Sequence, residues 1–266
     1  MLKDITIGQY YPQDTAVHRM DPRLKILTMF AFIVSIFFVK SYWVYGAIFA
    51  YLALVVFTSK LPPKMVVKGL KPLRWILLLT FLVNLLFTPG TVLWQWKFLK
   101  ITEEGIHQSL MMAIRLVLLV TGTSLLTLTT SPIELTDGIE RLLAPLKVIG
   151  VPAHELAMMM TIALRFIPTL IEETDKIMKA QMARGADFET GNLITRAKNL
   201  IPLLVPLFID AFHRAEELGA AMEARCYHGG EGRTKLNPLH ITTMDVILFV
   251  GSLAFFIGVI LLGILR

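Results

Sequence analysis

Two short segments in the second half of the chain place an arginine at the end of a charged helical stretch. The first reads Met-Ala-Arg-Gly at positions 182–185, and the second reads Glu-Ala-Arg-Cys at positions 223–226. A guanidinium group presents a planar set of N–H donors that suits a carboxylate, often through two parallel hydrogen bonds. The repeated pattern therefore predicts two narrow helix ends, each offering one arginine to an acidic surface of a partner. The residues of this predicted site are Ala183, Arg184, Gly185, Ala224, Arg225 and Cys226.

A simpler interpretation is that the two arginines only stabilise the negative ends of their helices. Such a contribution is worth about 0.3–1 kcal/mol. Lys or His would serve equally well in that role, and neither needs a preceding alanine. The occurrence of the same pattern at two helix ends favours docking over capping.

An amphipathic helix is expected to position Arg184. We predict that it begins near Pro168, because proline is favoured in the first turn of a helix. Asp175 and Lys179 form an acid-then-base pair four residues apart, which supports a helix with a solvated side. Gly185 then suits the position that follows a helix end.

A second helix, from about Pro206 to Arg225, is expected to position the other arginine. Asp210 and Arg214 form its pair at four-residue spacing, and the glycine pair at 229–230 is expected to end it. Two prolines, at positions 202 and 206, predict a bend near its start, which could be a hinge or a fixed corner.

The rest of the chain has the composition of a membrane protein. Of the 266 residues, 55% are hydrophobic, and the mean hydropathy is +0.64. Several apolar runs are long enough to cross a bilayer. We therefore predict an all-α polytopic membrane protein with about five transmembrane helices and a cytoplasmic or interfacial coupling-helix region. The predicted spans are 26–39, 42–58, 75–94, 110–130 and 245–264.

This interpretation divides the chain into four parts. They are an N-terminal segment, 1–25, four membrane helices within 26–130, a coupling-helix region, 131–243, and a C-terminal membrane helix within 244–266. Two apolar stretches inside the coupling region, 153–167 and 196–212, also contain charged residues or prolines. We interpret them as helices at the membrane surface or packed beneath the spans, and two additional crossings are the alternative.

Basic residues are distributed unevenly along this topology. They gather in the N-terminal segment, in the connection from 60 to 74 and in the coupling region, whereas the other side receives only Lys40, Lys97, Lys100 and Arg266. By the positive-inside tendency, the N-terminus and the coupling region are cytoplasmic and the C-terminus is outside. This asymmetry explains the pI near 9.4 without a nucleic-acid partner.

No motif for catalysis or cofactor binding is present. The sequence has no GxxxxGK[ST] loop for nucleotide phosphates, its six histidines are scattered, and it has a single cysteine. We therefore predict no metal site and no bound cofactor, and ATP hydrolysis would have to come from a partner. Arg115 lies within a predicted span, where it could snorkel or pair structurally, or less plausibly contact a substrate.

Taken together, these residues resemble the transmembrane T component of energy-coupling factor transporters, which import vitamins and metal ions and are related to ABC transporters. The resemblance covers nearly the whole chain. It is carried by GQY at 8–10, HRMDPR at 18–23, LTLTTSP at 126–132, LTDG at 135–138, RFIP at 165–168, ARG at 183–185, RAEE at 214–217 and AMEAR at 221–225. Cys226 stands where the family usually has glycine, which leaves open the backbone shape after Arg225 but not the role of the arginine.

The resemblance implies a non-catalytic scaffold in a prokaryotic cell membrane. Its partners would be the lipid bilayer, two cytoplasmic ABC-type ATPase subunits that use ATP and Mg, and a substrate-binding membrane protein, the S component. In the family, the two arginines dock in grooves on the ATPases, whose closure reorients the S component. The alternatives are a permease that binds substrate itself, a membrane adaptor or assembly protein, and an intramembrane enzyme, for which no catalytic constellation is present.

Overall fold

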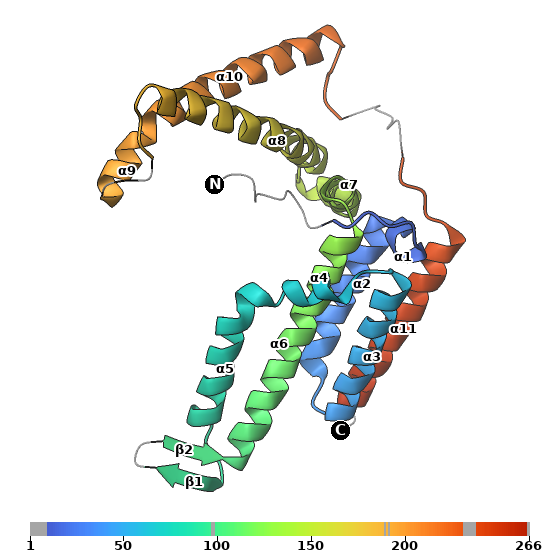
Figure 1. Cartoon of the computed structure of the whole chain (residues 1–266). Coiled ribbons are helices and arrows are strands. Elements are labelled where there is room, and N and C mark those ends of the chain that lie inside the picture. Colours follow the sequence, from blue (N-terminus) through green and yellow to red (C-terminus); the bar gives the residue numbers. More distant parts are fainter. Residues whose placement is uncertain (1–9, 97–98, 189, 191, 231–237, 265–266) are drawn as a thin grey trace. The chain divides into compact units, whose positions relative to one another are not determined.

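The computed structural model describes residues 10–96, 99–188, 190, 192–230 and 238–264. The chain forms two compact units. The bundle unit consists of Gly8–Gly138 and Leu239–Arg266, and the tip unit consists of Met1–Ile7 and Ile139–Pro238. Helices dominate both units, which confirms the predicted all-α class (Figure 1).

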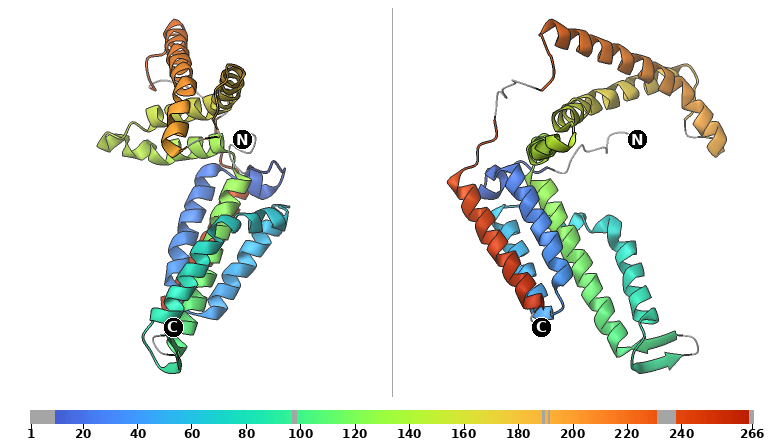
Figure 2. Two further views of the ribbon diagram at one scale, coloured as in Figure 1. Left: turned by 60° about the vertical axis from the view of Figure 1, so that its left-hand side comes forward. Right: turned by 180° about the vertical axis from the view of Figure 1, so that it is seen from behind.

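The bundle unit contains one helix for each of the five predicted spans. These are α2 (Pro22–Phe38), α3 (Tyr42–Thr58), α5 (Arg74–Phe87), α6 (Glu103–Thr129) and α11 (Thr243–Ile264). Shorter elements accompany them: α1 (Ala16–Arg19), α4 (Pro63–Lys68), η2 (Lys71–Leu73) and the start of α7 (Pro132–Leu143). Helices α2, α3, α6 and α11 lie side by side, and α5 packs along α6 (Figure 1, Figure 2).

Four helical segments among the described residues are long and apolar enough to cross a membrane. They are Pro63–Phe87, Glu103–Thr129, Ala153–Ala183 and Thr243–Ile264. Helix α3 is apolar but has 17 residues, which is near the lower limit of about 17–25 for a span. Because the segment Ala153–Ala183 also qualifies by length and composition, both placements of the 153–167 stretch remain predictions.

The third and fourth predicted spans have the wrong boundaries. Helix α5 ends at Phe87, and an antiparallel hairpin of β1 (Val92–Trp96) and β2 (Leu99–Thr102) follows it. Helix α6 begins at Glu103, before the predicted 110, because the Thr102 hydroxyl caps its first turn by accepting from the Gly105 N–H at 3.0 Å. Hydropathy does not register such polar first turns, so it places the start too late.

The core of the bundle unit lies where α2, α3, α6 and α11 meet. Ile36, Ile48, Leu128 and Phe256 are almost completely buried there. Gly122 of α6 allows close approach of α2, because a Cβ at this position would lie 2.4 Å from an atom of the Phe32 ring. This packing fixes four helices whose outer surfaces are apolar and exposed.

Lys25, at the start of α2, ties three segments of the bundle unit together. Its buried Nζ donates to the His18 carbonyl at 2.9 Å, to the Thr129 carbonyl at 3.0 Å and to the Thr130 hydroxyl at 3.2 Å. All three ammonium N–H donors therefore have an acceptor. The bonds join α2 to the end of α6 and to α1, the short helix that precedes α2.

His18 completes this contact in its neutral form. Burial, and next the charge of Lys25, lower the pKa of the His18 imidazole. The neutral ring can donate from Nε2 to the Tyr11 carbonyl at 3.1 Å and accept at Nδ1 from the Thr15 hydroxyl at 2.7 Å. The segment before α2 is thus fixed by paired polar groups.

The tip unit contains η3 (Ala144–Ile149), α8 (Ala153–Ala183), α9 (Leu193–Asn199) and α10 (Ile201–Ala224), and α8 packs against α10. The prediction that a helix begins at Pro168 is wrong, because α8 runs through this residue. A proline kinks a helix rather than ending it where the turns on both sides are held. Ala157 is buried before Pro168, and Glu173 is paired after it.

The second tip helix also starts earlier than predicted. Helix α10 begins at Ile201, with Pro202 in its first turn and Pro206 inside it. Proline in the first turn removes an N–H that has no helical partner in any case, so only Pro206 costs a helical hydrogen bond.

Replacing Lys25 by Met should lower the stability of the bundle unit. The change keeps the apolar stem but leaves three acceptors without their donor, and leaving buried groups unpaired costs on the order of 1–3 kcal/mol. Thermal unfolding in detergent checks this, with exposed Lys40→Met as the matched control, expected to change stability by about 0.5 kcal/mol or less. Equal effects of the two substitutions would contradict the role given to Lys25.

Candidate functional site

The helix end that carries Arg184 is closed by its own backbone. Arg184 is the C-cap of α8, and Gly185 follows with a φ of +90°. The Gly185 N–H donates to the Met182 carbonyl at 2.9 Å, and the Ala186 N–H donates to the Gln181 carbonyl at 3.0 Å. This pair of bonds is the Schellman motif, in which a left-handed residue satisfies the last carbonyls of a helix.

The helix end that carries Arg225 has the same bonds at the same offsets. Arg225 is the C-cap of α10, and Cys226 follows with a φ of +57°. The Cys226 N–H donates to the Glu223 carbonyl at 2.9 Å, and the Tyr227 N–H donates to the Met222 carbonyl at 3.0 Å. Cys226 therefore takes the left-handed conformation that Gly185 takes at the first end, which settles the backbone shape that the sequence left open. The predicted helix end near Arg225 is confirmed, but Cys226 ends the helix and the glycine pair at 229–230 does not.

Both arginines are exposed, as are the alanines that precede them. Among the described residues, neither guanidinium makes an ion pair or a hydrogen bond to a helix carbonyl. Backbone N–H groups already bind the carbonyls that a capping side chain would reach. The local structure thus leaves each guanidinium available for an external carboxylate.

Arg214 links the two helices that end in these arginines. Its Nε donates to Asp210 of α10 at 2.8 Å, and its Nη2 forms an ion pair with Glu173 of α8. The predicted pair of Asp210 and Arg214 is confirmed, as is the pair of Asp175 and Lys179, at 3.0 Å. The reach of Arg214 to the other helix is not evident from the spacing.

Glu173 depends strongly on this arginine. Its side chain is 19% exposed, and the second carboxylate oxygen is buried without a hydrogen-bond partner among the described residues. A carboxylate in that position is costly to leave without its cation. The ion pair therefore fixes how α8 and α10 lie against one another.

A second contact set holds the chain that follows the Arg225 end. The Tyr227 hydroxyl donates to the Met158 sulfur at 3.2 Å, and Gly230 lies so close to His154 that a Cβ would be 2.4 Å from its ring. His154 Nδ1 in turn lies 2.9 Å from Glu140 of α7. The sequence does not indicate these contacts of Tyr227 and Gly230, because a tyrosine after a helix end and a glycine pair are common in loops.

Apolar side chains cover the outer faces of the two tip helices. On α8, Met159 is 57% exposed, and on α10, Phe208 and Phe212 are 63% and 69% exposed. Further exposed members are Leu156, Met160, Ile167, Leu204, Val205 and Ile209. An apolar surface of this extent is typical of a contact with another protein or with lipid.

Arg115 has structural partners within the bundle unit. Its Nε donates to the Tyr45 hydroxyl and its Nη2 to the Val39 carbonyl, both at 3.1 Å, and its guanidinium lies 5.8 Å from the centre of the Phe37 ring. Val39 ends α2, so Arg115 satisfies a carbonyl at a helix terminus. These contacts favour structural pairing over contact with a substrate.

No group of three or more His, Cys, Asp or Glu side chains that could hold a metal ion occurs in the part of the chain that the structure describes.

Comparison with known proteins shows the family of the chain. Residues 13–236 match the CbiQ family, described as cobalt transport protein. Energy-coupling factor transporter transmembrane proteins, named EcfT, align over almost the whole chain. The protein from Ruminiclostridium cellulolyticum is 55% identical over 262 residues, covering 98% of each chain.

The chain belongs to the EcfT family. The Clostridium kluyveri member is 57% identical over 255 residues, covering 95% of this chain and 93% of its own. The Bacillus subtilis member is 51% identical over 251 residues, covering 94% and 95%. As an EcfT protein, the chain is a non-catalytic membrane subunit of an energy-coupling factor transporter, which confirms the resemblance of the sequence to the T component.

Cys226→Gly should stabilise the second helix end while leaving its shape unchanged. A left-handed conformation costs a residue with a side chain about 1–2 kcal/mol, and glycine avoids this cost. Cys226→Val should be destabilising by a similar amount, because a β-branched residue suits positive φ poorly. The apparent Tm in detergent measures both effects, and Gly185→Ala is the matched change at the first end, expected to lower it. A lower Tm for Cys226→Gly would contradict the shared motif.

Arg214→Ala should cost on the order of 1–3 kcal/mol, because it leaves the Glu173 carboxylate unpaired. The double variant with Glu173→Ala should lose less than the sum of the single variants, with a coupling of about 0.5–3 kcal/mol. Unfolding measurements of the four proteins give this coupling. Lys179→Ala is the control, since its pair with Asp175 is largely exposed and worth about 1 kcal/mol or less. Strict additivity of the two truncations would refute the link between α8 and α10.

Proposed function

We propose that this chain is the scaffold and coupling subunit of an ATP-driven importer, in which Arg184 and Arg225 dock on two cytoplasmic ABC-type ATPase subunits. The observation that carries the proposal is the equivalence of the two helix ends. Each closes with the same backbone hydrogen bonds and leaves an exposed arginine without a partner among the described residues. Two equivalent ends suit two similar partners.

The proposed docking contact is a charge-assisted one. A guanidinium at a helix end can enter an acidic groove and form two parallel hydrogen bonds with a carboxylate. Ala183 and Ala224 keep the helix ends narrow, so that a groove can close around the arginine. Movement of either ATPase would then act directly on the last turn of α8 or α10.

Coupling requires that movement at one helix end reaches the rest of the tip unit. The ion pair between Arg214 and Glu173 supports such coupling, because a displacement of α10 would move Glu173, which lies in the second half of α8. The exposed apolar faces of both helices suit a substrate-binding membrane protein, the S component. We propose that the S component rests there and changes orientation when the helices move, which releases a vitamin or another micronutrient inside.

ATP and Mg belong to the partner subunits in this proposal. The chain has no phosphate-binding loop. Its part is to convert ATPase closure into movement within the membrane. We propose that the N-terminus and both arginines lie on the cytoplasmic side and the C-terminus outside, which the distribution of the basic residues supports.

Arg184→Ala and Arg225→Ala should each impair substrate uptake, and the double variant should lose ATPase association or its coupling to uptake. Truncating one partner of a buried charged contact costs about 2–5 kcal/mol. Lys should restore little, because a point charge does not reproduce the planar fork. If the arginines only stabilised helix ends, Lys would restore fully and Ala would cost about 1 kcal/mol or less.

Uptake in whole cells and pull-down of the ATPase subunits measure these effects. Exposed Arg141→Ala, at the end of α7, is the matched control and should behave as wild type. Normal uptake and pull-down in the double alanine variant would remove both arginines from the mechanism.

The proposed orientation can be tested with the single native cysteine. Cys226 is exposed in the structure, so a membrane-impermeant maleimide should label it only after the cells are permeabilised. For comparison, Lys40→Cys in a Cys226→Gly background should react in intact cells, because Lys40 is predicted to lie outside. Labelling of Cys226 in intact cells would reverse the topology.

A further inference from the structure

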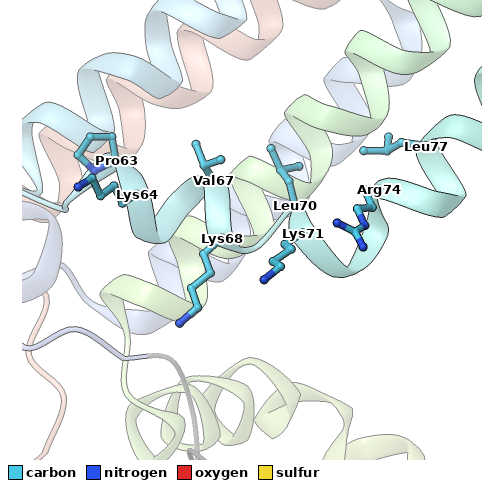
Figure 3. Close-up of a pocket in the computed structure, with 8 residues that line it drawn as sticks. All are labelled: Pro63, Lys64, Val67, Lys68, Leu70, Lys71, Arg74 and Leu77. Atoms are coloured by element: carbon cyan, nitrogen blue, oxygen red, sulfur yellow. The ribbon is translucent and has the colours of Figure 1, made fainter.

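A groove with an apolar wall lies in the bundle unit, and the chain segment that forms it carries four cations. The groove has a volume of about 630 Å³ and is formed by α4, η2 and the start of α5. Lys64, Lys68, Lys71 and Arg74 line it, together with Val67 and Leu70. In Figure 3, Lys68, Lys71 and Arg74 extend from one side of this segment, whereas Val67 and Leu70 extend from the other. The segment is therefore amphipathic.

The cations of this groove have no acidic neighbour along the chain. The sequence contains no Asp or Glu between Asp21 and Glu103. Helix α6, which packs against α4, also has no acidic residue from Gly105 to its end at Thr129. Among the described residues, none of the four basic side chains forms an ion pair. Four exposed like charges within eleven positions repel one another, so an anion placed among them would be stabilised.

The position of the groove is that of a membrane boundary. The segment from α4 to η2 runs across the long axes of α5 and α6 (Figure 1), and the apolar helix α5 begins where it ends. Gly69 allows this segment to pack closely on α6, because a Cβ at position 69 would lie 2.7 Å from the Ser124 hydroxyl oxygen. Trp75 is 67% exposed beside Arg74, whose guanidinium lies 5.3 Å from its ring. An exposed tryptophan next to basic residues at a span end is typical of the headgroup region.

We propose that this segment binds an anionic phospholipid, with the headgroup on its basic side and the upper acyl chain in the apolar groove. The basic side chains would contact the phosphate, and Val67 and Leu70 would contact the upper acyl chain. Clusters of Lys and Arg beside a membrane helix attract anionic lipid, at about 1 kcal/mol for each cation near the surface. A free phosphate would use the cations but not the apolar side, so the combination favours a lipid. The proposal is independent of the docking of Arg184 and Arg225.

The fluorescence of Trp75 can report the lipid beside it. The full chain, with Trp43, Trp94 and Trp96 replaced by Phe, would be reconstituted in vesicles that contain brominated phosphatidylglycerol or brominated phosphatidylcholine at the same mole fraction. Bromine quenches tryptophan at short range. We expect the anionic lipid to be enriched roughly tenfold at Trp75 and to quench correspondingly more at low mole fraction.

Variants and competitors then separate the possible ligands. Changing all four groove cations to Gln should remove the preference, whereas changing Lys40, Lys176, Lys179 and Lys198 to Gln removes the same charge elsewhere and should keep it. The proposal would be overturned if the two lipids quenched Trp75 equally in the chain that retains all four cations. This measurement does not depend on any variant of the groove. Loss of the preference when glycerol phosphate is added would also overturn the proposal, and would indicate a free-phosphate site. Loss of the preference only in complex with the partner subunits would overturn it in favour of a protein contact.

Discussion

The arrangement of the tip unit depends on the ion pair between Arg214 and Glu173. It joins α10 to α8, and the carboxylate of Glu173 is too buried to lose its cation without a large cost. Pro168 and Pro206 each remove a hydrogen bond from one of these helices, so local backbone bonding is weakened close to this contact. The charged contact therefore supplies rigidity where both helices are least regular. Without it, α8 and α10 would lose the charged contact between them, and movement of one would be transmitted less directly to the other.

The two helix ends reach the same backbone shape with different residues. Gly185 takes the left-handed conformation at little cost, whereas Cys226 takes it against its side-chain preference. Retention of the same hydrogen bonds despite that cost indicates that the shape after Arg225 is imposed by its surroundings. The contacts of Tyr227 with Met158 and of Gly230 with His154 hold the following chain against the start of α8. Arg225 consequently projects from a fixed corner, which suits docking better than a mobile end would.

The sequence was sufficient for the fold class, the family and the location of both arginine ends. Apolar runs predict membrane helices because the bilayer tolerates little else, and charged residues four apart predict the pairs that the structure contains. The sequence was insufficient for the helix boundaries, because the Thr102 cap and the two internal prolines determine them more than hydropathy does. Long-range contacts were also missed. Arg214 reaches Glu173 across 41 positions, and Lys25 reaches Thr129 across 104, distances over which no periodic pattern carries information.

The central claim is that both arginine ends lie in contact with ATPase subunits, and a photo-crosslinker tests it most directly. Cys226 is exposed beside Arg225, so a benzophenone maleimide can be attached to it before the chain is assembled with its partner subunits. At the first end, Gly185→Cys in a Cys226→Gly background offers the corresponding position. The account predicts that irradiation joins each labelled position to an ATPase subunit, and that replacing the neighbouring arginine by Ala abolishes the product. Crosslinks from both positions to lipid or to a membrane partner alone, with no ATPase product, would contradict it.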